Sequence, residues 1–223
     1  LDRLTFELFE GQVTVLLGAN GEGKSTFLKL ALGLLRAEAG SLRVMGRDPV
    51  RKGGAIRRRV GYVPDRPDVY DWMTPRDLYA FLRPQYPTWN DDHAARLVEH
   101  LRVPTATRFK ALSRGEGMKA MLVAALAFEP ELLLLDEPFA GLDPLVREEV
   151  LKGILDELRE GERTVLCTTH DLDVAARIAD RVAILAHGRI VAHGTLAEVL
   201  RTDEEPVRIP EKIRDLMAEA QLA

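Results

Sequence analysis

A glycine-rich loop that ends in a lysine and two hydroxyl residues lies near the start of the sequence. It reads Gly18-Ala19-Asn20-Gly21-Glu22-Gly23-Lys24-Ser25-Thr26, which has the spacing G-x-x-x-x-G-K-S. An apolar run at residues 13–17 precedes the loop, and a helix-like pattern follows it. Glycines here let backbone N–H groups converge on an oligophosphate at the positive end of the new helix. The pattern predicts a phosphate-binding loop in which Lys24 reaches the β- and γ-phosphates and Ser25 binds Mg²⁺.

Two acids directly follow four consecutive leucines at residues 132–137. A four-leucine run is typical of a buried central strand, and ligands of open α/β sheets bind at the carboxyl ends of strands. Asp136 fits the aspartate that supports Mg²⁺ in a nucleoside triphosphatase, and Glu137 fits the residue that polarises the attacking water. The alternative is a strand that merely ends in solvated acids, and the phosphate loop upstream argues against it.

Length and composition limit the classes of protein to consider. The 223 residues leave room for one substantial α/β domain or two small lobes, and the net charge of -4 argues against a protein that coats nucleic acid. The single cysteine, Cys167, excludes a disulfide within the chain. The longest apolar stretch, residues 121–128, is too short to span a bilayer, so we expect no direct membrane insertion.

Strand-like and helix-like segments alternate along the chain, which predicts an α/β fold with a largely parallel sheet flanked by helices. The segment 71–117 contains no convincing strand and is expected to be an inserted helical subdomain of a domain covering residues 1–200. Residues 201–223 form a charged C-terminal tail, expected to end in a short helix. Strands are expected at residues 13–17, 41–45, 60–63, 132–135, 165–168 and 182–185, with a strand-like segment at 4–8; helices are expected from the loop to about residue 35 and at 91–101, 118–128 and 144–158, with one more between the last two strands.

With these motifs in this order, the sequence from about residue 4 to residue 200 resembles an ABC-type ATPase, the nucleotide-binding subunit of an ABC transporter. The resemblance implies a P-loop NTPase core, ATP and Mg²⁺ as ligands, and a homodimer or heterodimer of ATPase subunits. Residues 112–116, Leu-Ser-Arg-Gly-Glu, match the family signature loop, and residues 141–143, Gly-Leu-Asp, match the loop that crosses the dimer interface. The expected nucleotide-binding residues within a subunit are Gly18, Asn20, Gly21, Gly23, Lys24, Ser25 and Thr26. Ser113 and Gly115 are expected to contact the nucleotide bound to the partner subunit.

The resemblance also implies a catalytic set and a metal set. Lys24, Glu137 and His170 are the expected catalytic residues, with His170 as the switch histidine that contacts the γ-phosphate. Ser25, Asp136 and Asp65 are the expected Mg²⁺ residues.

The chain departs from the family pattern at three places. Asp65 stands where glutamine is usual, and Arg114 and Glu116 stand where glycine and glutamine are commonest. The aromatic residue that stacks on adenine usually precedes the first strand, so an N-terminal segment is expected to be missing and adenine stacking is unassigned.

Residues 70–89 hold both tryptophans and three of the four tyrosines, and resemble the exporter branch linked to antibiotic or cell-envelope stress. These aromatics are expected either to dock a permease or to form the core of the helical subdomain, and the two roles are compatible. The expected function is ATP-driven dimerisation that powers a membrane permease, for export, at the cytoplasmic face of the cell membrane. The alternative is an ABC-type ATPase without a transporter; the long coiled coil of the DNA type and the second cassette of the translation type are both missing from the sequence, and no nucleic-acid partner is expected.

Overall fold

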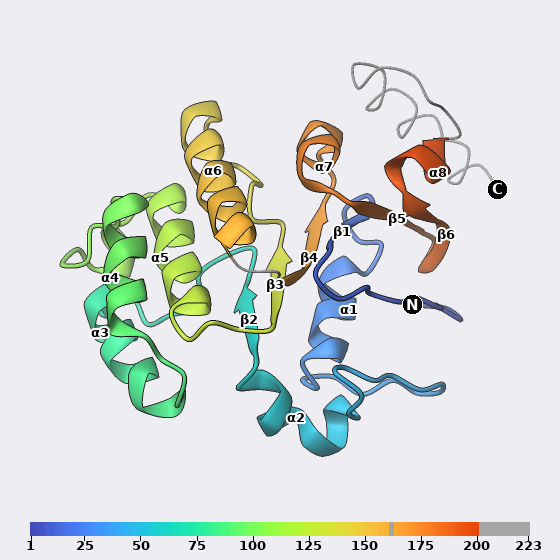
Figure 1. Ribbon diagram of the computed structural model, residues 1–223, viewed down its shortest axis with the longest axis horizontal. Coiled ribbons are helices and arrows are strands. Elements are labelled where there is room, and N and C mark those ends of the chain that lie inside the picture. The colour runs from blue at the N-terminus through green and yellow to red at the C-terminus, as the bar shows by residue number, and fades with distance from the viewer. Residues whose placement is uncertain (161–162, 201–223) are drawn as a thin grey trace. The chain divides into compact units, whose positions relative to one another are not determined.

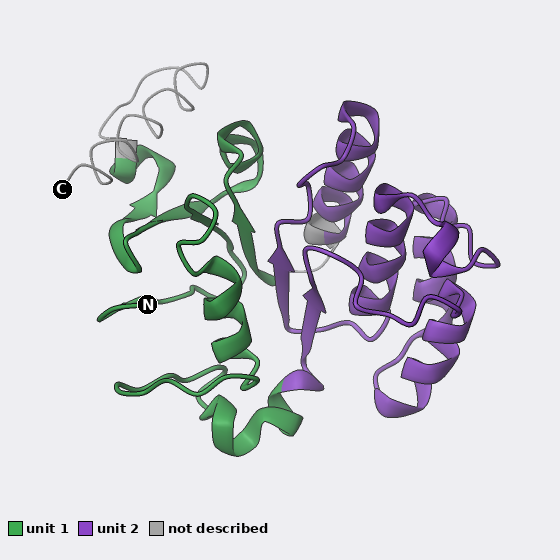
Figure 2. Cartoon of the chain, turned by 180° about the vertical axis from the view of Figure 1, so that it is seen from behind, with its two compact units in different colours: residues 1–56, 164–223 green, residues 57–163 purple. Residues whose placement is uncertain are grey.

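The computed structural model describes residues 1–160 and 163–200, and the chain forms two compact units (Figure 2). Unit 1 comprises residues 1–56 and 164–223, and unit 2 comprises residues 57–163. The C-terminal tail expected at residues 201–223 lies outside the described residues, and so does its short helix.

Unit 1 is built on four strands, and the phosphate loop lies at the carboxyl end of one of the inner strands. Its strands lie in the order β4 (Thr164–Thr169), β1 (Val13–Leu17), β5 (Arg181–Ala186) and β6 (Arg189–Thr195). The strand β1 is parallel to both of its neighbours, and β6 is antiparallel to β5. The helices of this unit are α1 (Lys24–Ala31), α2 (Pro49–Arg57, whose last residue belongs to unit 2), α7 (Leu172–Ile178) and α8 (Leu196–Leu200) (Figure 1).

The strand β1 is buried along its whole length, as expected of a strand that is covered on both faces and apolar except for Thr14. The hairpin between β5 and β6 turns on His187 and Gly188, which have φ angles of 50° and 72°. Positive φ at both central residues is the type I′ geometry that matches the twist of the flanking strands. The sequence analysis missed β6, although a glycine two residues after an apolar run is a signal for this turn.

Unit 2 pairs the strand β2 (Val60–Val63) in parallel with β3 (Leu132–Asp136). Its helices are α3 (Pro75–Leu82), α4 (Asp91–His100), α5 (Arg114–Leu126) and α6 (Pro144–Glu160), with single 3₁₀ turns η1 (Arg83–Gln85) and η2 (Phe109–Ala111). The helix α5 contacts α3, α4, α6 and β2, so it lies at the centre of the unit (Figure 1). Its apolar sequence follows from this burial on nearly every side.

The expected α/β fold class is confirmed: the strand pairs β1–β4, β1–β5 and β2–β3 are parallel, with helices around them. Residues 71–117 carry only helices and loops, while their independence as a subdomain stays a prediction. The strand expected at residues 41–45 is wrong, because this segment makes only one bridge, between Val44 and Arg47, around a tight turn. Residues 4–8 form no strand, and α5 begins four residues before the expected start.

Candidate functional site

The phosphate loop connects the carboxyl end of β1 to the first residue of α1. Gly21 and Gly23 have φ angles of 90° and 104°, a region in which side chains are strained. A Cβ atom on Gly18 would lie 2.8 Å from the carbonyl oxygen of Leu185 on β5. The loop therefore needs glycine at these positions, and it leads into the N-terminus of α1, the end of a helix that favours an anion.

Lys24 is the first residue of α1, and its side chain is only 5% exposed. Its ammonium donates hydrogen bonds to the carbonyl oxygens of Gly18 at 2.6 Å and Ala19 at 3.0 Å. These two hydrogen bonds hold the ammonium of Lys24 against the loop, where it would contact a bound phosphate chain. Ser25 and Thr26 follow on the first turn of the same helix.

His170 stands at the same edge of the sheet of unit 1. The register of β1 against β4 pairs Leu17 with Thr169, so Gly18 and His170 directly follow the ends of two adjacent strands. The side chain of His170 is exposed, and Asp171 after it caps α7 by accepting hydrogen bonds from the N–H groups of Asp173 and Val174. The carboxyl edge of this unit therefore combines the phosphate loop with the expected switch histidine.

The two acids of unit 2 lie where the sequence places them. Asp136 is the last residue of β3 and is 1% exposed, and Glu137 follows it and is also buried. Glu137 has a φ angle of 48°, which is unusual for a residue with a side chain. Such backbone strain persists only where surrounding structure enforces it, and it clusters at functional sites.

Tyr62 on β2 is a site residue that the sequence analysis missed. Its hydroxyl hydrogen-bonds the side chain of Asp136, and burial raises its pKa above the ordinary value, as do the negative charges of Asp136, Asp65 and Asp68. The hydroxyl therefore stays protonated and donates to the buried carboxylate. The alignment of β2 with β3, which puts Tyr62 beside Leu134, is what a sequence alone does not give.

Asp65 lies two residues after β2 and is exposed. Its negative charge raises the pKa of Tyr62, as that of Asp136 does, so both expected metal carboxylates act on one tyrosine in unit 2. The carbonyl oxygen of Asp65 accepts a hydrogen bond from Nη2 of Arg114 at 3.3 Å.

The signature residues form the first turn of α5. Ser113 is its N-cap, with Oγ 3.2 Å from the N–H of Glu116, and the N–H of Ser113 donates to Oε2 of Glu116 at 2.8 Å. Gly115 is buried, and a Cβ atom on it would lie 2.3 Å from Cγ1 of Val146 on α6. Asp143, in the expected interface loop, caps α6 by accepting hydrogen bonds from Leu145 and Val146.

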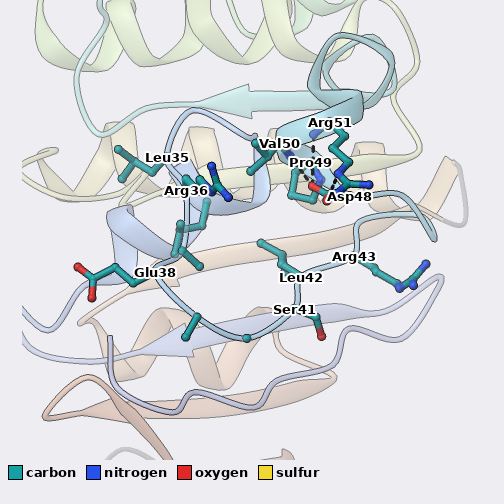
Figure 3. Close-up of a pocket in the computed structure, with 14 residues that line it drawn as sticks. Leu35, Arg36, Glu38, Ser41, Leu42, Arg43, Asp48, Pro49, Val50 and Arg51 are labelled. Carbon is teal, nitrogen blue, oxygen red and sulfur yellow. Dashed lines mark hydrogen bonds and ion pairs between the residues drawn. The ribbon is translucent and has the colours of Figure 1, made fainter.

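A hollow of about 750 Å³ in unit 1 is not at the phosphate loop (Figure 3). It lies beyond the opposite end of α1, between residues 35–43 and the start of α2. Asp48 at its wall accepts hydrogen bonds from the N–H groups of Val50 and Arg51 and caps α2. None of the residues that line this hollow is an expected site residue.

Each unit by itself carries residues of the types that bind Mg·ATP. Unit 1 supplies a glycine cradle, a buried lysine and a hydroxyl at a helix N-terminus, and unit 2 supplies a buried aspartate at a strand end. Across residues 1–160 and 163–200, no cluster of three or more His, Cys, Asp or Glu side chains could hold a metal ion. That is compatible with Mg²⁺, which is usually held by one or two protein ligands together with phosphate oxygens and waters.

No helix within the described ranges is long and apolar enough to cross a membrane.

Among curated proteins, the chain is similar to several ATP-binding proteins. It is 34% identical over 92% of its length to the uncharacterized ABC transporter ATP-binding protein sll0415 of Synechocystis, covering 59% of that protein. It is 35% identical over 89% of its length to the daunorubicin/doxorubicin resistance ATP-binding protein DrrA of Streptomyces peucetius, covering 62% of it. It is 37% identical over 90% of its length to the sulfate/thiosulfate import ATP-binding protein CysA of Yersinia pseudotuberculosis, covering 58% of it. The chain thus spans about three fifths of these relatives, and 12% of the ABC transporter ced-7 of Caenorhabditis elegans.

Solved structures share the fold. An ATP-binding subunit of an ABC transporter matches with a TM-score of 0.83 and 29% identity, covering 97% of this chain and 91% of that one. The dimeric ATP-binding cassette MJ0796, bound to ADP and Pi, matches with a TM-score of 0.76 and 21% identity, covering 86% of this chain and 88% of that one. The sequence profile of the family described as "ABC transporter" matches residues 1–140. With the motifs and the fold, these matches show that the chain belongs to the ABC transporter family as one of its ATPase cassettes.

Proposed function

We propose that this chain is the ATP-hydrolysing subunit of an ABC exporter, and that ATP-dependent dimerisation of two such subunits drives a membrane permease. The observation that carries the proposal is the presence of two sets of functional residues in one chain. One is a glycine loop that holds a buried lysine at a helix N-terminus, and the other is a buried aspartate followed by a backbone-strained glutamate.

The site residues are assigned roles by their chemistry. The N–H groups of residues 18–26 and the ammonium of Lys24 would bind the phosphates, and Ser25, Asp136 and Asp65 would hold Mg²⁺ or its waters. When bound, Mg²⁺ would neutralise the charge that develops on the transferred phosphoryl group. Glu137 would orient the attacking water, and His170 would contact the γ-phosphate.

Dimerisation would complete each site, because Ser113 and the backbone of Gly115 would contact the γ-phosphate bound to the other subunit. A related cassette fold is a dimer after hydrolysis, which supports this arrangement. The dimer would be a homodimer of this chain or a heterodimer with another ATPase subunit.

The permease would be a transmembrane partner, which would hold this subunit at the cytoplasmic face of the cell membrane. Export is favoured by the aromatic segment at residues 70–89 and by the acid at position 65, both of which resemble the exporter branch. One relative is named for drug resistance and another for import, so the direction must be measured.

The test starts with phosphate release by the purified chain in Mg·ATP, with Lys24→Ala as the inactive reference. The tagged chain is then recovered from detergent-solubilised membranes, and the co-purifying membrane protein is identified and reconstituted with it in vesicles. ATP-dependent movement of solute toward the side of the membrane that carries the ATPase subunit would be import and would contradict export. An active chain with which no membrane protein co-purifies would favour an ATPase not coupled to transport.

A further inference from the structure

The first turn of α5 is enclosed on two sides within unit 2. On one side lies the loop after β2, where the carbonyl oxygen of Asp65 accepts a hydrogen bond from Nη2 of Arg114. A Cβ atom on Gly117 would lie 3.1 Å from Cγ of Pro67 in that loop, so helix and loop are in close contact. On the other side, Gly115 packs against Val146 at the start of α6.

Arg114 also contacts the loop after β3. A Cβ atom on Gly141 would lie 3.1 Å from Nη1 of Arg114, 3.3 Å from its Cζ and 3.4 Å from its Nε. Because the three distances are nearly equal, the guanidinium group turns its face, not its edge, toward the place where a side chain at position 141 would begin. Gly141 has a φ angle of 65°, so both its backbone and its neighbour favour glycine there.

One side chain thus contacts both loops that follow the two strands of this unit. The loop at residue 65 carries an expected metal residue, and the loop at residues 141–143 follows Glu137 and is expected at the dimer interface. Only the combination in arginine of a long stem, several donors and a flat face allows both contacts at once.

We propose that Arg114 is a positioning residue that couples these two loops, so that the metal-side loop and the interface loop move together during the ATP cycle. The inference rests on the proposed function for its consequence in catalysis, but the contacts themselves belong to the single chain. Arg114 acts on catalysis through the two loops and does not contact the nucleotide bound to its own subunit.

Two readouts test the coupling. The first is hydrogen exchange of backbone amides at residues 64–68 and 140–144 in the nucleotide-free chain. Pro64, Pro67 and Pro144 have no backbone N–H, so the amides followed are those of Asp65, Arg66 and Asp68 and of residues 140–143. Arg114→Ala should speed exchange in both segments at least about threefold, within the range expected for losing one such contact. Arg114→Lys can donate to the carbonyl of Asp65 but has no flat face, so it should protect residues 64–68 and leave residues 140–144 fast.

The second readout is steady-state ATP hydrolysis. Arg114→Ala should lower kcat about three- to tenfold and leave KM for ATP within twofold, because positioning rather than ATP binding is lost. Arg76→Ala, which removes an exposed arginine of α3 in the same unit, should change neither constant more than twofold. Gly141→Ala should lower kcat in the parent chain, and its additional effect should shrink when Arg114 is already alanine.

The outcomes separate the two proposals. A parent chain that releases no phosphate defeats the proposed function, while the exchange measurement still decides the contact. An active parent chain whose Arg114→Ala variant keeps both its kcat and its exchange rates overturns the coupling role. Exchange that speeds in only one segment with Arg114→Ala also overturns it, because the two loops would then be independent.

Discussion

Ser113 and Glu116 hold each other in a reciprocal pair of hydrogen bonds at the start of α5: Oγ of Ser113 accepts from the N–H of Glu116, and Oε2 of Glu116 accepts from the N–H of Ser113. This is a capping box. The bond from the backbone N–H of Ser113, together with its hydroxyl, holds the pKa of the Glu116 carboxyl below its ordinary value. The acid that departs from the family pattern therefore has a structural partner within its own helix.

The capping box predicts which substitutions at position 116 are tolerated. Glu116→Ala removes the acceptor for the N–H of Ser113 and should lower the free energy of unfolding by about 1 kcal/mol. Glu116→Gln keeps an acceptor oxygen and should stay within about 0.5 kcal/mol of the parent chain. Urea unfolding of the two variants measures both values, and equal destabilisation by Ala and Gln would rule out the capping role.

Asp65 is predicted to sense the metal. Asp65→Ala should raise the Mg²⁺ concentration for half-maximal ATP hydrolysis, because one carboxylate near the metal is lost. Asp65→Gln, the residue usual in the family, should keep much of the activity. The measurement is hydrolysis rate against free Mg²⁺, with Asp68→Ala as the control, since Asp68 also acts on Tyr62 but is not an expected metal residue. Superimposable titrations for the parent chain and Asp65→Ala would exclude this role.

The aromatic residues of 70–89 divide between two roles. Tyr79 is partly buried, and its hydroxyl donates a hydrogen bond to the carbonyl oxygen of Ala120. The ring of Tyr86 stacks on that of Phe128, with the ring centroids 4.0 Å apart. These two tyrosines therefore pack inside unit 2. Tyr70 and Trp72 are 71% and 63% exposed, and their rings stack on each other with the centroids 5.7 Å apart. The exposed pair is therefore the part of the segment available to a partner.

We predict that Tyr70→Ala or Trp72→Ala weakens permease recovery about thirtyfold, which corresponds to about 2 kcal/mol for a buried interface anchor. The melting temperature should change little, because both side chains point outward. Tyr79→Ala, which empties a packed position, should show the opposite pattern of a lower melting temperature. Pull-down of the permease combined with thermal melts distinguishes them, and normal recovery with a destabilised Trp72→Ala would assign the pair to the core.

His93 and Glu157 link α4 to α6, with Nε2 of His93 3.0 Å from Oε2 of Glu157. Burial by itself raises the pKa of Glu157, but the hydrogen bond and charge of His93, with the charges of Arg163 and Arg96, bring it below its ordinary value. A lowered pKa contributes stability above the unfolded pKa of about 4.3, and this stability is lost as pH falls through the folded pKa.

Glu157→Gln should accordingly lower the free energy of unfolding by about 1–3 kcal/mol at pH 7, the range for hydrogen bonds to a charged group. The difference from the parent chain should shrink as pH falls below about 4. Urea unfolding between pH 3 and 8 measures it, with the exposed Glu99→Gln on α4 as the control. A difference that does not change with pH would contradict the linkage.

The sequence predicted best where one motif specifies its own local geometry. The phosphate loop and the acid-tipped strand each depend on residues within about ten positions. The segment 41–45 was predicted wrongly because its alternating pattern gives no information about whether a neighbouring strand pairs with it.

Contacts between segments distant in sequence explain what the sequence analysis missed. Tyr62 meets Asp136 only because β2 and β3 align in register, and Arg114 meets Asp65 and Gly141 only because α5 packs between two loops. Arg114 stood out in the sequence as a departure from the family pattern, but nothing local indicates which residues either side chain contacts. The roles of the site residues themselves stay predictions.

The central claim, that Glu137 orients the water that attacks ATP, is tested most directly with Glu137→Gln in Mg·ATP. This change keeps the size of the side chain and removes its charge. We predict that phosphate release falls to background while ATP binding survives, and that light scattering detects a stable ATP-bound dimer, because hydrolysis normally reopens it. Phosphate release at the parent rate, with no dimer in Mg·ATP, would contradict the account.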